Sequence, residues 1–128
     1  WAQIAMRHRA GNFHDALVPD AINLIDFLEI HKDHYEVGAH LKKIHDKLTT
    51  GLAIVALQKP MGRDEAIGGR VTMEVSRLYL ALMKSPNRMK IVDGKMWAAE
   101  SNPNGLVMPY KIVKGIQLKR DGEWTRGE

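Results

Sequence analysis

The chain has 128 residues, of which 45% are hydrophobic and none is cysteine. This composition is typical of one globular domain with enough apolar residues for a core, and it excludes a disordered or fibrous chain, a disulfide scaffold and any thiolate metal site. The 19 Lys and Arg residues outnumber the 15 Asp and Glu residues, so the net charge is +4, which is compatible with a polyanionic partner.

The ends of the sequence and its apolar runs bear on where the protein acts. No run approaches the roughly 18 consecutive apolar residues of a membrane helix, and the N-terminus lacks the pattern of a secretory signal. We therefore expect a cytoplasmic protein with no membrane partner. The sequence begins at Trp1 rather than at Met. We expect the chain to be the C-terminal part of a longer protein.

Two short apolar runs predict parallel strands. Residues 21–28 are almost continuously apolar, as are residues 52–57, and such runs are typical of strands that are covered on both faces. Between them, Asp33 and Glu36 have the spacing of a capping box, which predicts the start of a helix. Apolar residues then recur at helical spacing up to Gly51, which is expected to end the helix. They are Val37, Leu41, Ile44 and Leu48. A strand, a helix and a strand with short connections form a βαβ unit.

The second half of the chain predicts a loop followed by antiparallel strands. Residues 59–70 are rich in glycine, proline and charge and have no periodicity, so we expect a mobile loop. Pro109 is expected to place its strand at an edge or a bulge of the sheet. The later strands are expected over residues 77–83, 88–97, 106–113 and 115–119, with turns at 102–105 and 121–122. The whole predicts one α/β domain over residues 1–128, whose sheet is parallel first and antiparallel at its C-terminal end.

Two polar residues close the two apolar runs. Ligands collect at the carboxyl ends of parallel strands, so Asp26 and Gln58 are candidate site residues. A carboxylate there can hold the water shell of a phosphate-bound Mg²⁺, and an amide can sense a phosphate or orient a water. Glu29 follows closely and could polarise a water. The alternative for each is an ordinary polar strand end.

The order of several short motifs resembles a known family. They are IDFLEI at 25–30, the helix pattern at 36–48, AIVALQ at 53–58, IGGRVTMEVSR at 67–77, LYLALM at 78–83, KIVDGK at 90–95, NPNG at 102–105 and GEW at 122–124. In this order and spacing they resemble the C-terminal half of the RecA-like P-loop ATPase core of replicative DNA helicases of the DnaB type and their phage relatives. The resemblance covers residues 20 to 126.

The resemblance implies a role for each segment and for several residues. Residues 20–58 would carry the Walker B strand, a helix and the sensor strand, residues 59–76 the DNA loop, and residues 77–126 the closing strands. Asp26 would position Mg²⁺, and Gln58 would link the γ-phosphate to the DNA loop. Lys95 would reach the nucleotide of a neighbouring subunit. The implied DNA contacts are Lys59, Arg63, Gly68, Gly69 and Arg70.

Two features depart from the family pattern. The phosphate-binding motif G-x-x-x-x-G-K-[ST] is absent, and in the family it precedes the Walker B strand, so this fragment alone is predicted to be inactive as an ATPase. Trp97 stands where the family places an arginine finger. Either Arg88 or Lys90 replaces that arginine, or activation in trans is weaker or different.

The resemblance therefore implies a part of an ATP-dependent helicase or translocase with ATP and Mg²⁺ as cofactors. The whole protein would act as a homo-oligomeric, hexameric ring on single-stranded DNA in a bacterial cell, encoded by the bacterium or by a phage. Two alternatives stay open. One is a non-enzymatic RecA-like module for nucleic-acid binding or oligomerisation. The other is a different RecA-superfamily ATPase, such as a recombinase or a plasmid-replication helicase.

The six histidines raise the question of a metal site. His31 and His34 lie three residues apart, and His40 and His45 lie on the expected helix. On an ideal helix the last two point about 140° apart, so they do not converge on one ion. We interpret the histidines as solvated surface residues.

Overall fold

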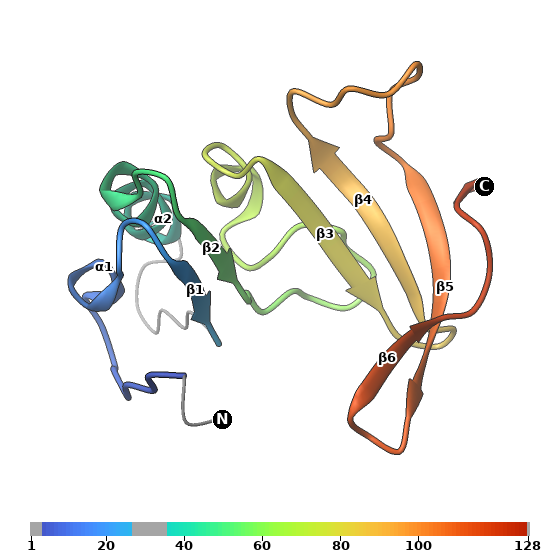
Figure 1. Cartoon of the computed structure of the whole chain (residues 1–128). Helices are drawn as coiled ribbons and strands as arrows, with labels where there is room; N and C mark the ends of the chain where they lie inside the picture. Colours follow the sequence, from blue (N-terminus) through green and yellow to red (C-terminus); the bar gives the residue numbers. More distant parts are fainter. Residues whose placement is uncertain (1–3, 27–35, 128) are drawn as a thin grey trace. The chain divides into compact units, whose positions relative to one another are not determined.

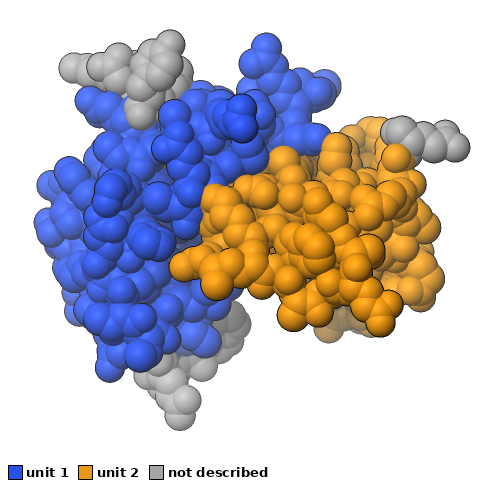
Figure 2. Space-filling model, turned by 90° about the horizontal axis from the view of Figure 1, so that it is seen from above, with its two compact units in different colours: residues 1–75 blue, residues 76–128 orange. Residues whose placement is uncertain are grey.

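The computed structural model describes residues 4–26 and 36–127 (Figure 1). The chain separates into two compact units, residues 1–75 and residues 76–128 (Figure 2). The first contains a two-stranded sheet and the second a five-stranded sheet. A single domain over residues 1–128 stays a prediction. None of the helices formed by the described residues is both long and apolar enough to cross a membrane.

The first unit contains the predicted βαβ arrangement. Strand β1 (Ile22–Ile25) pairs in parallel with β2 (Leu52–Val55), and helix α2 (Glu36–Lys47) connects them in sequence (Figure 1). The register places Ile22 opposite Leu52 and Ile25 opposite Val55. The prediction of an α/β chain with parallel strands followed by antiparallel strands is therefore confirmed, but the strands form two separate sheets rather than the one sheet expected.

The core of the first unit lies between α2 and one face of this sheet. Val37, Leu41 and Ile44, which the helical spacing singled out, are buried. The residues that pack against Val37 and Leu41 come from a short helix, α1 (Phe13–Ala16), from both strands and from the segments that follow β2; they are Phe13, Ile25, Val55, Leu57 and Val75.

Helix α2 ends at Lys47, whereas the sequence predicted a helix that continues up to Gly51. Gly51 therefore does not end the helix. The segment after the helix bonds to the residues just before β1: the amides of Thr49 and Gly51 both donate to the carbonyl of Pro19, at 2.9 and 3.0 Å. A Cβ atom on Gly51 would lie 2.4 Å from the carbonyl oxygen of Ala21. Gly51 is therefore required by a close backbone approach rather than by the end of the helix.

One face of the parallel pair is uncovered, contrary to the prediction of strands covered on both faces. Ile22 and Leu24 on β1 are 74% and 70% exposed, and their register partners Leu52 and Ile54 on β2 are 52% and 55% exposed. The alternate residues of both strands face α2 and are half-buried. A continuous apolar run shows that both faces can be covered, but the described residues supply a cover for only one.

We expect this uncovered face to make the 128-residue chain self-associate, because contiguous apolar patches on strands promote association. Replacing Leu24 and Ile54 together by threonine places β-branched, less apolar side chains at both strand positions. This double substitution should lower the weight-average mass measured by light scattering at high protein concentration. Val18→Thr is the matched control, since Val18 is also exposed but lies outside both strands. A double variant that associates as strongly as the parent chain would contradict this prediction.

The loop after β2 is more ordered than the sequence predicted. The amide of Ile67 donates to the carbonyl of Gln58 at 2.8 Å, which closes the loop at its base. It is followed by a 3₁₀ helix, η1 (Gly69–Thr72), in which the Thr72 hydroxyl donates to the carbonyl of Gly69. A Cβ on Gly38 of α2 would lie 3.1 Å from the Cβ of Val71, so helix and 3₁₀ helix are closely packed. Residues 59–68 form no helix or strand, as predicted, but this segment is closed at its base and is followed by a helical turn.

The second unit is an antiparallel sheet. It contains β3 (Leu78–Met83), β4 (Arg88–Gly94), β5 (Leu106–Val113) and β6 (Gln117–Arg120) in that spatial order, with β7 (Thr125–Arg126) also paired to β5. The strand prediction over 88–97 is too long, because regular pairing ends at Gly94. The buried hydrophobic side chains of this unit are Tyr79, Ala81, Val107, Met108 and Tyr110.

Pro109 lies in an interior strand, which corrects its predicted edge or bulge position. Strand β5 pairs with β4 over residues 107–109, and on its other side with β7 at 106–107 and with β6 at 110–113. On this second side of β5, Pro109 lies between the residues that pair with β7 and those that pair with β6. Its missing N–H therefore leaves no gap in a ladder, and its carbonyl still accepts a hydrogen bond from the Asp121 amide at 2.9 Å.

Candidate functional site

Asp26 and Gln58 lie at the same edge of the parallel pair. Asp26 comes directly after β1, and Gln58 is the third residue after β2. The amide of Ala56 donates to the carbonyl of Ile25 at 2.9 Å, so pairing continues beyond the regular strands toward both residues. Both side chains are exposed. The sequence-predicted pair is therefore brought together at the carboxyl edge, where parallel sheets bind ligands.

The Asp26 carboxylate provides one oxygen donor group at this edge. Within residues 4–26 and 36–127, no group of three His, Asp or Glu side chains could hold a metal ion. A single carboxylate fits Mg²⁺, which keeps most of its water shell and takes its other ligands from phosphates, better than it fits an ion that needs a full protein cage. Glu29, the other predicted acid, falls outside the described residues.

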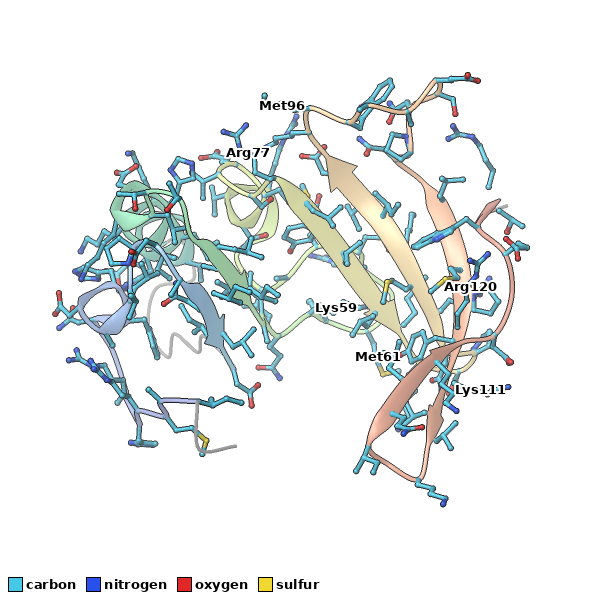
Figure 3. All side chains as sticks on the ribbon, in the orientation of Figure 1. Lys59, Met61, Arg77, Met96, Lys111 and Arg120 are labelled. Carbon is cyan, nitrogen blue, oxygen red and sulfur yellow. The ribbon has the colours of Figure 1, made fainter. Side chains whose placement is uncertain are left out.

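Gln58 is connected directly to the loop that follows it. Its backbone carbonyl accepts the Ile67 amide, while its side chain stays exposed. The Lys59 ammonium donates to the carbonyl of Arg63 at 2.8 Å and so ties the two sides of the loop together. Met61 lies between them and is 98% exposed, and Figure 3 shows it with Lys59 on this loop. Lys59 thus has a structural contact in addition to its charge.

The remaining predicted DNA contacts are the glycine pair near the end of this loop and the two arginines before and after it. Gly68 and Gly69 both have positive φ, 113° and 68°, which favours glycine over other residues at these positions. Arg63 and Arg70 are exposed. Two exposed guanidinium groups and a glycine backbone are suited to phosphate groups, because the charges attract them and glycine allows close approach.

Lys95 lies in the second unit, directly after β4. Its Nζ atom is 3.8 Å from Oδ2 of Asp93, and its amide donates to the carbonyl of Arg77 at 2.9 Å. The next residue, Met96, has a φ of 55°, and the Arg77 guanidinium donates to its sulfur; Figure 3 shows these two side chains together. Trp97 is 43% exposed.

The structure bears on the two proposed replacements for the missing arginine finger. Arg88 is the first residue of β4, whereas Lys95 follows its last residue, so about 20 Å of extended strand separates them. Lys90 is half-buried within the strand. Neither side chain starts beside Lys95. The replacement of the arginine that the resemblance implies, and a weaker or different activation, all stay predictions.

No family model, curated protein or solved structure matches this chain. The predicted site residues fall into two sets, one in each compact unit. Asp26, Gln58 and the loop at 59–70 form one continuous set in the first unit, and Lys95 belongs to a separate set in the second.

Of the two helix histidines, His45 is exposed, as predicted, whereas His40 is half-buried. His45 lies beside Asp46, with 3.3 Å between Nδ1 and Oδ1, and Asp46 also accepts a hydrogen bond from Lys42 at 2.6 Å. Two hydrogen bonds lower the pKa of the Asp46 carboxyl group: the one from Lys42 has the larger effect, and the one from His45 has the smaller effect. His31 and His34 fall outside the described residues.

The sequence analysis overlooked two residues near Lys95. Asn104 was assigned only to a turn, and Arg126 was not singled out. The Asn104 side chain contacts Asp93 and the amide of Gly94, and Arg126 donates to the carbonyls of Asn102 and Asn104. The NPNG motif at 102–105 indicated a turn but not that its second asparagine reaches back to β4.

Proposed function

We propose that this chain is the C-terminal part of a RecA-like, ATP-dependent motor of the DnaB and phage helicase type. The whole protein acts as a hexameric ring and moves along single-stranded DNA in the bacterial cytoplasm. The observation that carries this proposal is the common edge of Asp26 and Gln58, with the loop at 59–70 continuing directly from Gln58.

Each residue of the first set has one role in this proposal. Asp26 holds Mg²⁺ through water beside the nucleotide, and Gln58 contacts the γ-phosphate. Arg63 and Arg70 contact the phosphates of the DNA strand, with Lys59 and the backbone of Gly68. Gly69 contributes close approach only, because its amide donates to the carbonyl of Ala66 at 2.9 Å. ATP itself binds through a P-loop in the segment that precedes this chain, and Lys95 of a neighbouring subunit completes the site.

The path from nucleotide to DNA is supported by the hydrogen bond between Gln58 and Ile67, at 2.8 Å. This bond joins the residue at the strand end to the residue that precedes the glycine pair. A displacement of the Gln58 backbone is therefore passed to Gly68 without crossing the whole loop. Because Lys59 also bonds to Arg63, the loop moves as a unit rather than unfolding.

The test is the substitution Asp26→Asn in the full-length protein. Asparagine keeps the size of the side chain but removes the charge that holds the cation, so kcat for DNA-stimulated ATP hydrolysis should fall at least tenfold. Asp20→Asn is the matched control, because Asp20 is an exposed acid that precedes β1 at its opposite end. Its activity should equal that of the parent protein.

Three results would decide among the candidate functions. Unchanged ATP hydrolysis in Asp26→Asn would remove the central assignment. DNA binding without any ATP hydrolysis in the full-length parent would support the non-enzymatic module instead. Strand exchange without unwinding would support a recombinase.

A further inference from the structure

A chain of polar contacts leads from the 102–105 turn to Lys95. The Asn104 amide nitrogen Nδ2 donates to Oδ1 of Asp93 at 3.3 Å, and its oxygen Oδ1 accepts the backbone amide of Gly94 at 2.7 Å. The second carboxylate oxygen of Asp93 faces the Lys95 ammonium at 3.8 Å. Asn104 thus orients both the carboxylate and the backbone that precede Lys95.

Arg126 holds the turn from the other side. Its two terminal nitrogens donate to the carbonyls of Asn104 and Asn102, at 3.0 and 2.6 Å. The Asn102 side chain in turn accepts the amide of Asn104 at 2.9 Å. A planar guanidinium that bonds two carbonyls fixes direction as well as distance, which a lysine in its place would not do.

The backbone around Lys95 is shaped for these contacts. Gly105 has a φ of 88°, which favours glycine, and a Cβ on Gly94 would make an ordinary contact with the Asn104 oxygen at 3.4 Å. Met96 adopts a φ of 55° without being glycine. Such a conformation persists only where its surroundings hold it, and it is typical of functional segments. Here the Arg77 carbonyl accepts the Lys95 amide, and the Arg77 guanidinium donates to the Met96 sulfur.

We propose that Asn104 and Arg126 are positioning residues for Lys95. Asn104 holds Asp93, and Asp93 keeps the Lys95 ammonium pointed in one direction, so that it meets the terminal phosphates of a nucleotide on the neighbouring subunit. A lysine has a flexible four-carbon stem, and fixing it before the phosphate arrives reduces the entropy lost on contact. The phosphate target rests on the proposed function, whereas the positioning of Lys95 does not.

The positioning itself is tested in the 128-residue chain by NMR relaxation of ¹³C-labelled lysine side chains. We expect the Cε group of Lys95 to be more ordered than that of Lys114, which is exposed in the turn after β5. Asn104→Ala and Arg126→Gln should each reduce the order of Lys95 to the level of Lys114. An equally mobile Lys95 in the parent chain, or one unaffected by Asn104→Ala, would overturn the proposal.

Matched variants separate positioning from loss of folding. Asn87→Ala removes an asparagine side chain from the turn before β4 but leaves its carbonyl, which accepts the Tyr110 amide, in place. Arg120→Gln removes an arginine that bonds only outside this network, to Gly122 and Glu123. Both controls should leave Lys95 ordered. If Asn104→Ala fails to fold, Asn104→Asp keeps the size and the acceptor for Gly94 but repels Asp93, and it should also release Lys95.

A double-mutant cycle in the full-length protein connects this network to turnover. Asn104→Ala should lower kcat about tenfold with KM for ATP changed less than twofold, and it should have no further effect when Lys95 is already alanine. Additive effects would show that Asn104 acts independently of Lys95 and would overturn the proposal. If Lys95→Ala leaves turnover unchanged, the proposed function of Lys95 fails, and the NMR result alone decides whether the network positions it.

Discussion

Gly51→Ala is expected to destabilise the first unit by about 3 kcal/mol. The added methyl group would meet three backbone atoms, the carbonyl oxygens of Ala21 and Pro19 and the amide of Ala21, at 2.4, 2.6 and 2.8 Å. Backbone atoms cannot move aside as a flexible side chain can. The same segment donates hydrogen bonds from Gly51 to Pro19 and from Leu52 to Ala21, so a shift that relieves the clash breaks the entry into β2.

Two probes locate this effect in the first unit. Helix α2 belongs to the first unit and dominates the helical circular dichroism signal, whereas Trp97 and Trp124 belong to the second and report on it by fluorescence once Trp1 is replaced by phenylalanine. In urea, Gly51→Ala should lower the midpoint of the helical transition. Gly11→Ala is the control, because a Cβ there would meet no atom within 4 Å. A Gly51→Ala midpoint equal to that of the parent would refute the close-approach argument.

Lys95→Ala is expected to lower ATP turnover of the full-length oligomer about 100-fold, the usual cost of removing one donor to a charge that develops in a reaction. Under the proposed function Lys95 acts on the neighbouring subunit, so the defect should be complemented. Subunits that carry Lys95→Ala still have Asp26, and subunits that carry Asp26→Asn still have Lys95. Mixing equal amounts should restore activity at roughly one interface in four.

The control for this mixture contains no complete site. Asp26→Asn subunits mixed with subunits that carry both Asp26→Asn and Lys95→Ala should stay inactive, because no subunit then holds the acid. Steady-state ATP hydrolysis with saturating single-stranded DNA measures both mixtures. If the first mixture is as inactive as its two components, Lys95 does not act between subunits.

The predictions from sequence succeeded where the signal is local. Val37, Leu41 and Ile44 recur at helical spacing, and they form the buried stripe of α2. The two apolar runs became β1 and β2, and the helix that lies between them in sequence is the kind of crossover that parallel strands need. The positions of Asp26 and Gln58 after these strands followed from the same reasoning, whereas their roles stay predictions.

The predictions failed where a partner distant in sequence decides the outcome. The proline alone predicts an edge position for its strand. However, β7 pairs with β5 before Pro109 and β6 pairs with β5 after it, so the strand is interior. The sequence predicts that Gly51 ends a helix. Glycine is instead required there because the backbone of Pro19 and Ala21, about 30 residues earlier, leaves no room for a Cβ atom. The side-chain contact of Asn104 with Asp93 was likewise invisible, since a turn motif does not specify which strand the turn packs against.

The amino-acid sequence by itself determined the kinds of element, their order and the polar residues that end the parallel strands. These depend on the periodicity of apolar residues and on turn chemistry, which act over a few neighbouring positions. The tertiary structure alone decided that residues 4–26 and 36–127 leave one face of the β1–β2 pair uncovered and that Gln58 is bonded to Ile67 across its loop. It also decided that Asn104 bonds to Asp93, which lies beside Lys95. Each of these is a contact between segments that only the folded backbone brings within hydrogen-bonding or packing distance.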